Sequence, residues 1–165
     1  MLKQTLLIIA LSGSALAGSG GASAAEFGTP EQAKDMLGRA VAEMKADKLA
    51  AIAKFNHNDP QFRDRDLFVF CFNQQDGRFT AHEAMVDQDV RNLKDVKGTW
   101  SGEEMYRNAK EAQIVEIDFV SPVPGSTSVA VKRSFVTRVG DQVCGVSSYL
   151  LNATVKPTTT AQGDW

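Results

Sequence analysis

The sequence predicts an α+β domain in which a long N-terminal helix packs on a five-stranded antiparallel sheet with a helix-containing insertion. Three observations predict this class. Apolar residues recur at helical spacing between residues 33 and 55, a β-rich hairpin spans residues 67–82, and three β-rich segments follow between residues 113 and 151. A helix followed by separate runs of strands is typical of α+β domains built around one core.

The first helix has a start signal at Thr29. A proline suits the first helical position after it, and Gln32 is placed to complete a capping box with Thr29. The apolar residues that follow at helical spacing are Ala33, Met36, Leu37, Ala40, Val41 and Met44. A second apolar stretch, residues 49–55, continues this helix or breaks it slightly near Asp47, and the turn-forming residues 56–60 end it.

A hairpin follows the helix. Residues 67–72 are β-rich and apolar on both faces, which is typical of a central strand. Alternate residues of a strand share a face, so three phenylalanines are expected together in the core: Phe68, Phe70 and Phe72. An Asp-Gly pair predicts the turn, residues 78–82 form the return strand, and residues 85–100 are expected to form a loop with one short helical turn.

A second helix is predicted to begin at Ser101, because Ser101 and Glu104 have the spacing of a capping box, and to end near Glu111. Three strands then complete the sheet, with turns marked by proline and glycine between them. Their expected positions are about residues 113–121, 127–139 and 143–151.

Residues 1–25 have the pattern of a secretory signal peptide, with the positive charge of Lys3, a short apolar run and a stretch of small residues. Cleavage after Ala17 and cleavage at or just after Ala24 both fit this pattern. We favour the second site, which starts the mature chain near Glu26. An uncleaved anchor is the alternative, but the apolar run is well short of the ~20 residues needed to span a bilayer.

This organisation predicts one periplasmic domain over residues 26–152 and a flexible tail over residues 153–165. No second apolar segment reaches membrane length, so no integral membrane segment is expected after cleavage. The whole chain has a formal net charge of −2, and the leader removes only the positive Lys3. A mildly acidic domain lacks the basic footprint of a nucleic-acid binder.

Cys71 and Cys144 are the two cysteines of the chain. An even count in an exported chain favours a disulfide between them, and the alternative is two separate buried thiols. The loop that the bridge closes is long, so the chain-entropy model assigns it roughly 4 kcal/mol.

Five segments carry recognisable motifs. The first is an Asp-Gly hairpin that ends in Ala-His, at residues 67–82, and the second is an N-L-x-D segment at residues 92–95. The other three are strand patterns at residues 115–124, 132–139 and 143–149, and the order of all five is more specific than any one of them. Together, over residues 30–151, they resemble a single Cache domain, a member of the PAS-like extracytoplasmic sensors.

The resemblance implies a free-standing periplasmic domain that senses a small molecule, of the organic-acid type, and acts through a membrane receptor or sensor kinase. The aromatic residues of the family's pocket are replaced by Ile117 and, in the next strand, Phe135. These departures leave an alternative open, namely a structural or protein-interaction module that keeps the Cache fold without a ligand pocket.

Four residues are candidates for ligand binding. His82 ends the hairpin and could donate a hydrogen bond to an anion, or pack at the surface. Lys132 matches a lysine of the family and could pair with a carboxylate, while its neighbour Arg133 points to the opposite face. Tyr106 could turn its hydroxyl into the pocket or pack in the core, and Trp100 could wall the pocket or anchor a lid.

Catalysis is not expected. The two histidines are far apart in the sequence, and no nucleophile elbow, zinc-protease or phosphate-loop motif is present. A metal site at His82, Glu83 and Asp87 is a minor alternative, and no cofactor is expected.

Overall fold

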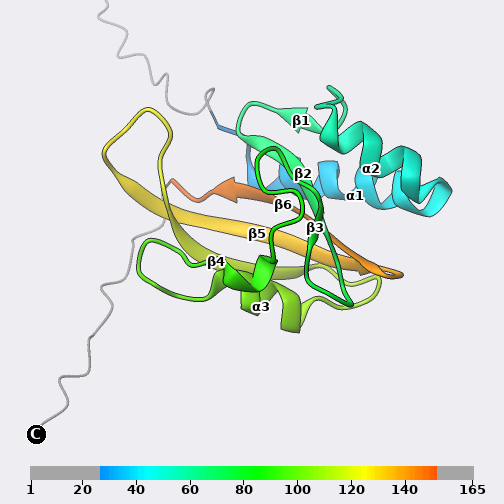
Figure 1. The fold of residues 1–165 in the computed structure, drawn as a ribbon. Coiled ribbons are helices and arrows are strands. Elements are labelled where there is room, and N and C mark those ends of the chain that lie inside the picture. Colours follow the sequence, from blue (N-terminus) through cyan, green and yellow to red (C-terminus); the bar gives the residue numbers. More distant parts are fainter. Residues whose placement is uncertain (1–26, 152–165) are drawn as a thin grey trace, which may run out of the picture.

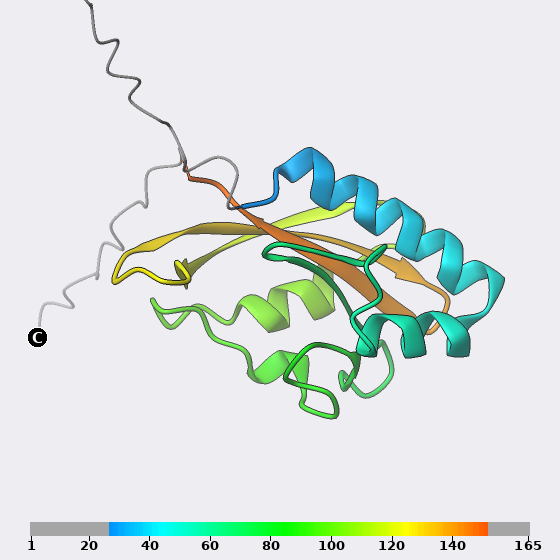
Figure 2. The same ribbon diagram turned by 90° about the horizontal axis from the view of Figure 1, so that it is seen from above.

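The computed structural model describes residues 27–151, which form a twisted antiparallel sheet with helices on one face and an irregular insertion on the other (Figures 1 and 2). The signal peptide predicted over residues 1–25 and the tail predicted over residues 153–165 lie outside this range. No helix within residues 27–151 is both long and apolar enough to cross a bilayer.

The sheet has six strands in the order β1-β2-β6-β5-β4, and β3 also pairs with β2. All the pairings between these strands are antiparallel. Their bounds are β1 Arg63–Asp64, β2 Leu67–Asn73, β3 Phe79–Ala81, β4 Val115–Pro122, β5 Val129–Val139 and β6 Gln142–Tyr149. The five predicted strands are confirmed. No sequence pattern indicates β1, because this strand is two residues long, charged and exposed.

The predicted N-terminal helix is two helices, α1 (Pro30–Ala46) and α2 (Lys48–Asn56). The capping box is confirmed, since the Thr29 side chain accepts from the Gln32 amide and the Gln32 side chain accepts from the Thr29 amide. Asp47 separates the helices: its amide donates to the Glu43 carbonyl at the end of α1, and its carboxylate accepts from the Ala50 amide at the start of α2.

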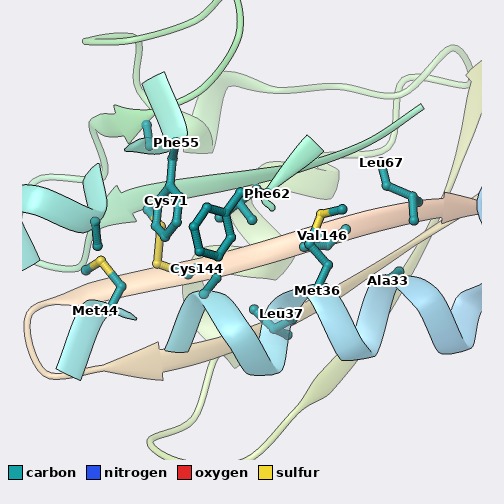
Figure 3. Close-up of a cluster of buried hydrophobic side chains, with 14 of the residues drawn as sticks. Ala33, Met36, Leu37, Met44, Phe55, Phe62, Leu67, Cys71, Cys144 and Val146 are labelled. Carbon is teal, nitrogen blue, oxygen red and sulfur yellow. A yellow bond between two sulfur atoms is a disulfide. The ribbon is translucent and has the colours of Figure 1, made fainter. Parts of the chain in front are cut away.

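One hydrophobic cluster lies between α1, α2 and the sheet, with α1 packing across β6 and β5 (Figure 3). The apolar stripe of α1 supplies much of it, including Met36 and Leu37, and Phe55 of α2 packs edge-on against Phe62. The Cys71–Cys144 disulfide is confirmed at the centre of this layer.

The disulfide joins two residues that face each other across the β2–β6 pair. Their Cα atoms lie 4.1 Å apart, and both side chains are fully buried. The bridge therefore ties a strand from the start of the domain to its last strand, directly under the helices.

The insertion between β3 and β4 covers the opposite face of the sheet. It contains a short 3-10 helix, η2 (Val90–Asn92), and α3 (Ser101–Asn108). A second hydrophobic cluster, centred on Phe70, Phe72 and Met105, lies beneath it. Gly102 allows the close approach of α3 to η2, because a Cβ at this position would lie 1.7 Å from the Val90 carbonyl oxygen.

Two predictions for α3 are wrong. Trp100, not Ser101, occupies the N-cap position and makes no side-chain capping bond, while Ser101 is buried in the first turn. The helix ends at Asn108 rather than near Glu111, because the chain becomes extended at Ala109.

The prediction for the three phenylalanines of β2 is correct for Phe70 and Phe72, which are buried. Phe68 is only partly buried: it packs against the edge of the second hydrophobic cluster, where a cavity opens between the sheet and the insertion.

Candidate ligand-binding cavity

A cavity of about 420 Å³ opens between the sheet and the insertion. Strands β2 to β6, the segment after β3, and α3 all contribute to its lining. Its apolar walls include Phe68, Phe70, Phe79, Met85, Met105 and Phe119. The volume lies within the range of about 300–1,000 Å³ that is typical of small-molecule sites.

His82 lies directly after β3 and lines this cavity. Its Nδ1 accepts a hydrogen bond from the Ala84 amide at 3.1 Å, so the neutral ring carries its proton on Nε2. The ring makes edge contacts with Phe68 and Phe79, at centroid distances of 5.2 and 4.9 Å. Burial among these rings lowers the pKa of His82 to about 4, so the side chain is neutral at pH 7.

Lys132 lines the same cavity from β5, where it faces Phe119 on β4 and Tyr149 on β6. Its Nζ lies 4.6 Å from the centre of the Tyr149 ring, a cation–π contact. Burial lowers the pKa of Lys132, an effect that the nearby Asp66 and Glu83 oppose. No carboxylate within residues 27–151 lies within ion-pair distance of Nζ.

Arg133, the next residue on β5, faces the other side of the sheet. Its guanidinium pairs with Asp118 and, at 2.7 Å, with Glu116, which also pairs with Lys34 of α1. The alternation of a strand therefore brings Lys132, and not Arg133, to the cavity, as the sequence predicts.

Most other polar groups of the lining already have partners. The Ser134 and Ser147 hydroxyls are 2.6 Å apart and bond to each other. Asp95 accepts from the backbone amides of three residues of the chain, those at positions 97, 99 and 120. Glu83 pairs with Arg63 at 2.6 Å. The hydroxyl of Tyr149 donates to a backbone carbonyl. Lys94 is exposed at the rim, over the Trp100 ring. Lys132 Nζ and His82 Nε2–H are thus the two donors from less exposed side chains of the described lining for which no acceptor is present within residues 27–151.

Tyr106 and Trp100, the other two predicted site residues, do not line the cavity. The hydroxyl of Tyr106 donates to the Gln74 carbonyl at 2.9 Å, and the Arg91 guanidinium covers its ring at 5.1 Å. Trp100 is 49% exposed, with Lys94 Nζ 3.8 Å from the centre of its ring. Tyr106 therefore points from α3 towards the β2–β3 hairpin, and Trp100 lies at the surface just before α3. Neither residue belongs to the candidate site.

A second hollow, which we call the outer hollow, adjoins the cavity and has a volume of about 320 Å³. The two share four lining residues: Phe68, Glu83, Pro124 and Lys132. The outer hollow adds Phe27, Arg63, Arg65 and Asp66, and is therefore much richer in charge than the cavity.

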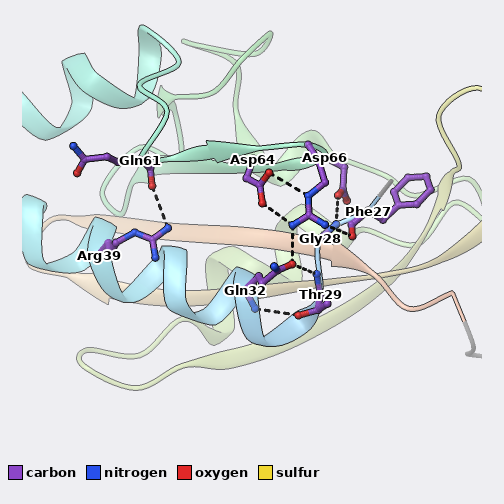
Figure 4. Close-up of polar contacts among 9 residues, drawn as sticks. Phe27, Gly28, Thr29, Gln32, Arg39, Gln61, Asp64 and Asp66 are labelled. Atoms are coloured by element: carbon purple, nitrogen blue, oxygen red, sulfur yellow. Dashed lines mark hydrogen bonds and ion pairs between the residues drawn. The ribbon is translucent and has the colours of Figure 1, made fainter. Parts of the chain in front are cut away.

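The polar wall of the outer hollow is ordered by contacts with the start of the domain (Figure 4). Arg65 donates to the Phe27 carbonyl at 2.7 Å and to the Gln32 side chain at 2.8 Å. Asp66 accepts from the Gly28 amide at 2.6 Å, while its other carboxylate oxygen is buried without a hydrogen-bond partner within residues 27–151.

Sequence reasoning missed several lining residues that the tertiary structure brings together. Phe119 and Met105 come from β4 and α3, and their cavity role has no local signal. Ser134 could have been found, because it lies two residues after Lys132 and so shares its face of β5. The metal site considered at His82, Glu83 and Asp87 is not supported, since no metal-binding group of three such residues occurs within the described chain.

Comparison with solved structures identifies the fold. A periplasmic sensor domain of a chemotaxis protein aligns with a TM-score of 0.53 and 22% identity, covering 73% of this chain and 89% of the other. A Cache chemosensory domain, described for its carboxylic acid recognition, aligns with a TM-score of 0.50 and 15% identity over 73% and 87% of the two chains. No family model matches the sequence, and no curated protein matches it.

The chain therefore has the α+β fold of Cache-type sensor domains, and the fold that the sequence motifs suggested is confirmed. At these identities the likeness concerns the fold alone.

Proposed function

We propose that this domain is an extracytoplasmic sensing module that binds a small carboxylate in the cavity, with Lys132 and His82 as its polar contacts. One observation carries the proposal. Two hydrogen-bond donors, Lys132 Nζ and His82 Nε2–H, face the cavity, and no acceptor within residues 27–151 pairs with either.

An ammonium group that loses water without gaining a hydrogen-bond acceptor raises the free energy of the protein. A carboxylate is a suitable partner because it only accepts hydrogen bonds, and a bond to a charged donor is roughly twice as strong as a neutral one. Neutral His82 adds a second donor without adding charge. A carboxylate can therefore accept from both groups, whereas a protonated amine, which has no acceptor, could accept from neither.

The site of action and the partner are part of this proposal. The signal-peptide pattern supports a periplasmic location. One structural neighbour is the periplasmic sensor domain of a chemotaxis protein, which supports a signalling partner in the membrane, such as a receptor or sensor kinase. Cross-linking in cells with and without a bound acid would detect a partner whose recovery depends on the ligand.

The alternative, a structural module without a pocket, rested on the replacement of aromatic pocket residues. Phe135 does not bear on the pocket, because it is fully buried on the α1 side of the sheet, with Lys34 Nζ 4.9 Å from the centre of its ring. Ile117 packs in the cluster under the insertion and leaves the cavity open.

Thermal unfolding and calorimetry of the mature protein with a panel of carboxylic acids, each beside its uncharged amide, test the proposal. An acid present at 100 times its dissociation constant stabilises the fold by about 2.7 kcal/mol. Lys132→Met should weaken binding by roughly tenfold or more, because a hydrogen bond to a charged group contributes about 1.5–3 kcal/mol.

The matched control is Lys110→Met, which removes the same charge from an exposed residue outside the cavity lining. Its affinity for the acid should equal that of the parent protein. The proposal fails if no acid binds, if the amides bind as well as the acids, or if both lysine variants weaken binding equally.

A further inference from the structure

The geometry points to a particular ligand class: we infer that the cavity selects monocarboxylates with an apolar body, such as an arylacetate, over short acids, diacids and amino acids. This inference rests on the proposed function, since it assumes that the carboxylate lies at Lys132. The added observations are the chemistry of the walls away from Lys132 and the lack of other free polar groups there.

The walls of the cavity away from Lys132 are mostly apolar. Rings and thioethers from four separate elements surround the space, with Phe70 from β2, Phe79 from β3, Phe119 from β4 and Met105 from α3. Its volume of about 420 Å³ is well above the ~150 Å³ of a cavity that holds benzene. A small acid such as acetate would leave most of this apolar surface unfilled.

Neither carboxylate of the cavity lining within residues 27–151 is free to pair with an ammonium group. The Glu83 carboxylate pairs with Arg63 and is exposed, and Asp95 is occupied by backbone amides. An amino acid would therefore bury its ammonium without a partner, which carries a large free-energy cost.

A second carboxylate also has little to bind. The other lysine of the lining is Lys94, which is exposed at the rim and lies over the Trp100 ring. Ion pairs with exposed lysines contribute only about 0–1 kcal/mol. A diacid that places one carboxylate at Lys132 would push the other among apolar side chains or leave it in solvent.

The two hollows fix the orientation of the ligand. Lys132 lies where the charged outer hollow meets the apolar cavity, since it lines both. A carboxylate bound to Lys132 at this junction lies at the charged end, which holds both arginines and carboxylates, and the apolar body extends between Phe70 and Met105. The site thus matches a molecule with one anionic end and one apolar end.

Calorimetric titration of the mature protein with phenylacetate, acetate, succinate, phenylalanine and phenylacetamide tests this inference. Phenylacetate should bind roughly tenfold or more tightly than each of the others, because it alone combines an apolar body with one unopposed carboxylate. Phe119→Ala should weaken phenylacetate binding about tenfold and leave acetate binding unchanged, since this side chain is only partly buried and contacts the body, not the carboxylate.

The outcomes separate the two proposals. Equal or tighter binding of acetate or succinate, lost in Lys132→Met, would overturn the apolar-body inference and leave the carboxylate proposal standing. Phenylacetamide binding as tightly as phenylacetate would overturn the carboxylate proposal and the inference with it. No binding of any of the five compounds would overturn both.

Discussion

Replacing both Cys71 and Cys144 with alanine is expected to lower the free energy of unfolding by about 4 kcal/mol. The bridge closes a loop with a sequence separation of 73, and the chain-entropy model for a loop of that length gives about 4 kcal/mol at 25 °C. The total free energy of unfolding of a domain of this size is only about 5–15 kcal/mol, so the bridge contributes a large part of it. Both side chains are fully buried, so the small cavities left by the sulfurs add to it.

Urea unfolding of the mature protein, followed by circular dichroism, measures this difference. The dependence of the free energy on urea should also become steeper, because the unfolded chain without the crosslink exposes more surface. The parent protein unfolded in reducing agent is the matched control and should behave as the double variant does. A loss below about 1 kcal/mol, with the same urea dependence, would refute the argument that the bridge acts by restricting the unfolded chain.

Three further predictions concern His82, the contact between η2 and α3, and the N-terminus. The pKa of His82 is about 4 in the folded protein against 6.5 ordinarily, so its contribution to stability is complete above about pH 6.5 and is lost as the pH falls towards 4. Denaturant unfolding measures how much the free energy of unfolding falls between pH 7 and pH 4.5. This decrease should be about 1–2 kcal/mol larger in the parent protein than in His82→Gln, and equal decreases would contradict the lowered pKa of His82. Gly102→Ala should destabilise the domain by about 2–4 kcal/mol, because the new methyl group collides with the Val90 carbonyl, whereas Gly38→Ala, in open space on α1, should stabilise it by about 0.5–1 kcal/mol. N-terminal sequencing of the exported protein should find a start near Glu26, and a chain that retains Lys3 would contradict the signal peptide.

Local patterns predicted most of the secondary structure because the relevant interactions are local. The capping box at Thr29 and the helical spacing after it depend on residues within a few positions of one another. The same pattern left open whether the helix continues or breaks near Asp47, and the structure shows the break. The errors occur where longer-range contacts decide: Ser101 is buried within the insertion and does not cap α3, and β1 is defined by its pairing with β2.

The candidate site was predicted in part. The alternation of a strand puts Lys132 and Arg133 on opposite faces, the resemblance favours Lys132, and His82 was chosen from its position at a hairpin end; Lys132 and His82 both line the cavity. Tyr106 and Trp100 depend on the rotation of α3 about its axis, which is set by the packing of Gly102 against η2 and is not visible in a short sequence pattern.

The sequence by itself determined the order of the elements and the placement of Lys132 and Arg133 on opposite faces of β5, because periodicity encodes both directly. Its even cysteine count favoured the Cys71–Cys144 bridge over two separate thiols. Only the tertiary structure decided that Phe70, Phe79, Phe119 and Met105 surround one space, and that Lys132 meets it without an ion-pair partner among residues 27–151. The physical reason is that a cavity is defined by side chains from five strands and an insertion, whose distances depend on packing that no local pattern records.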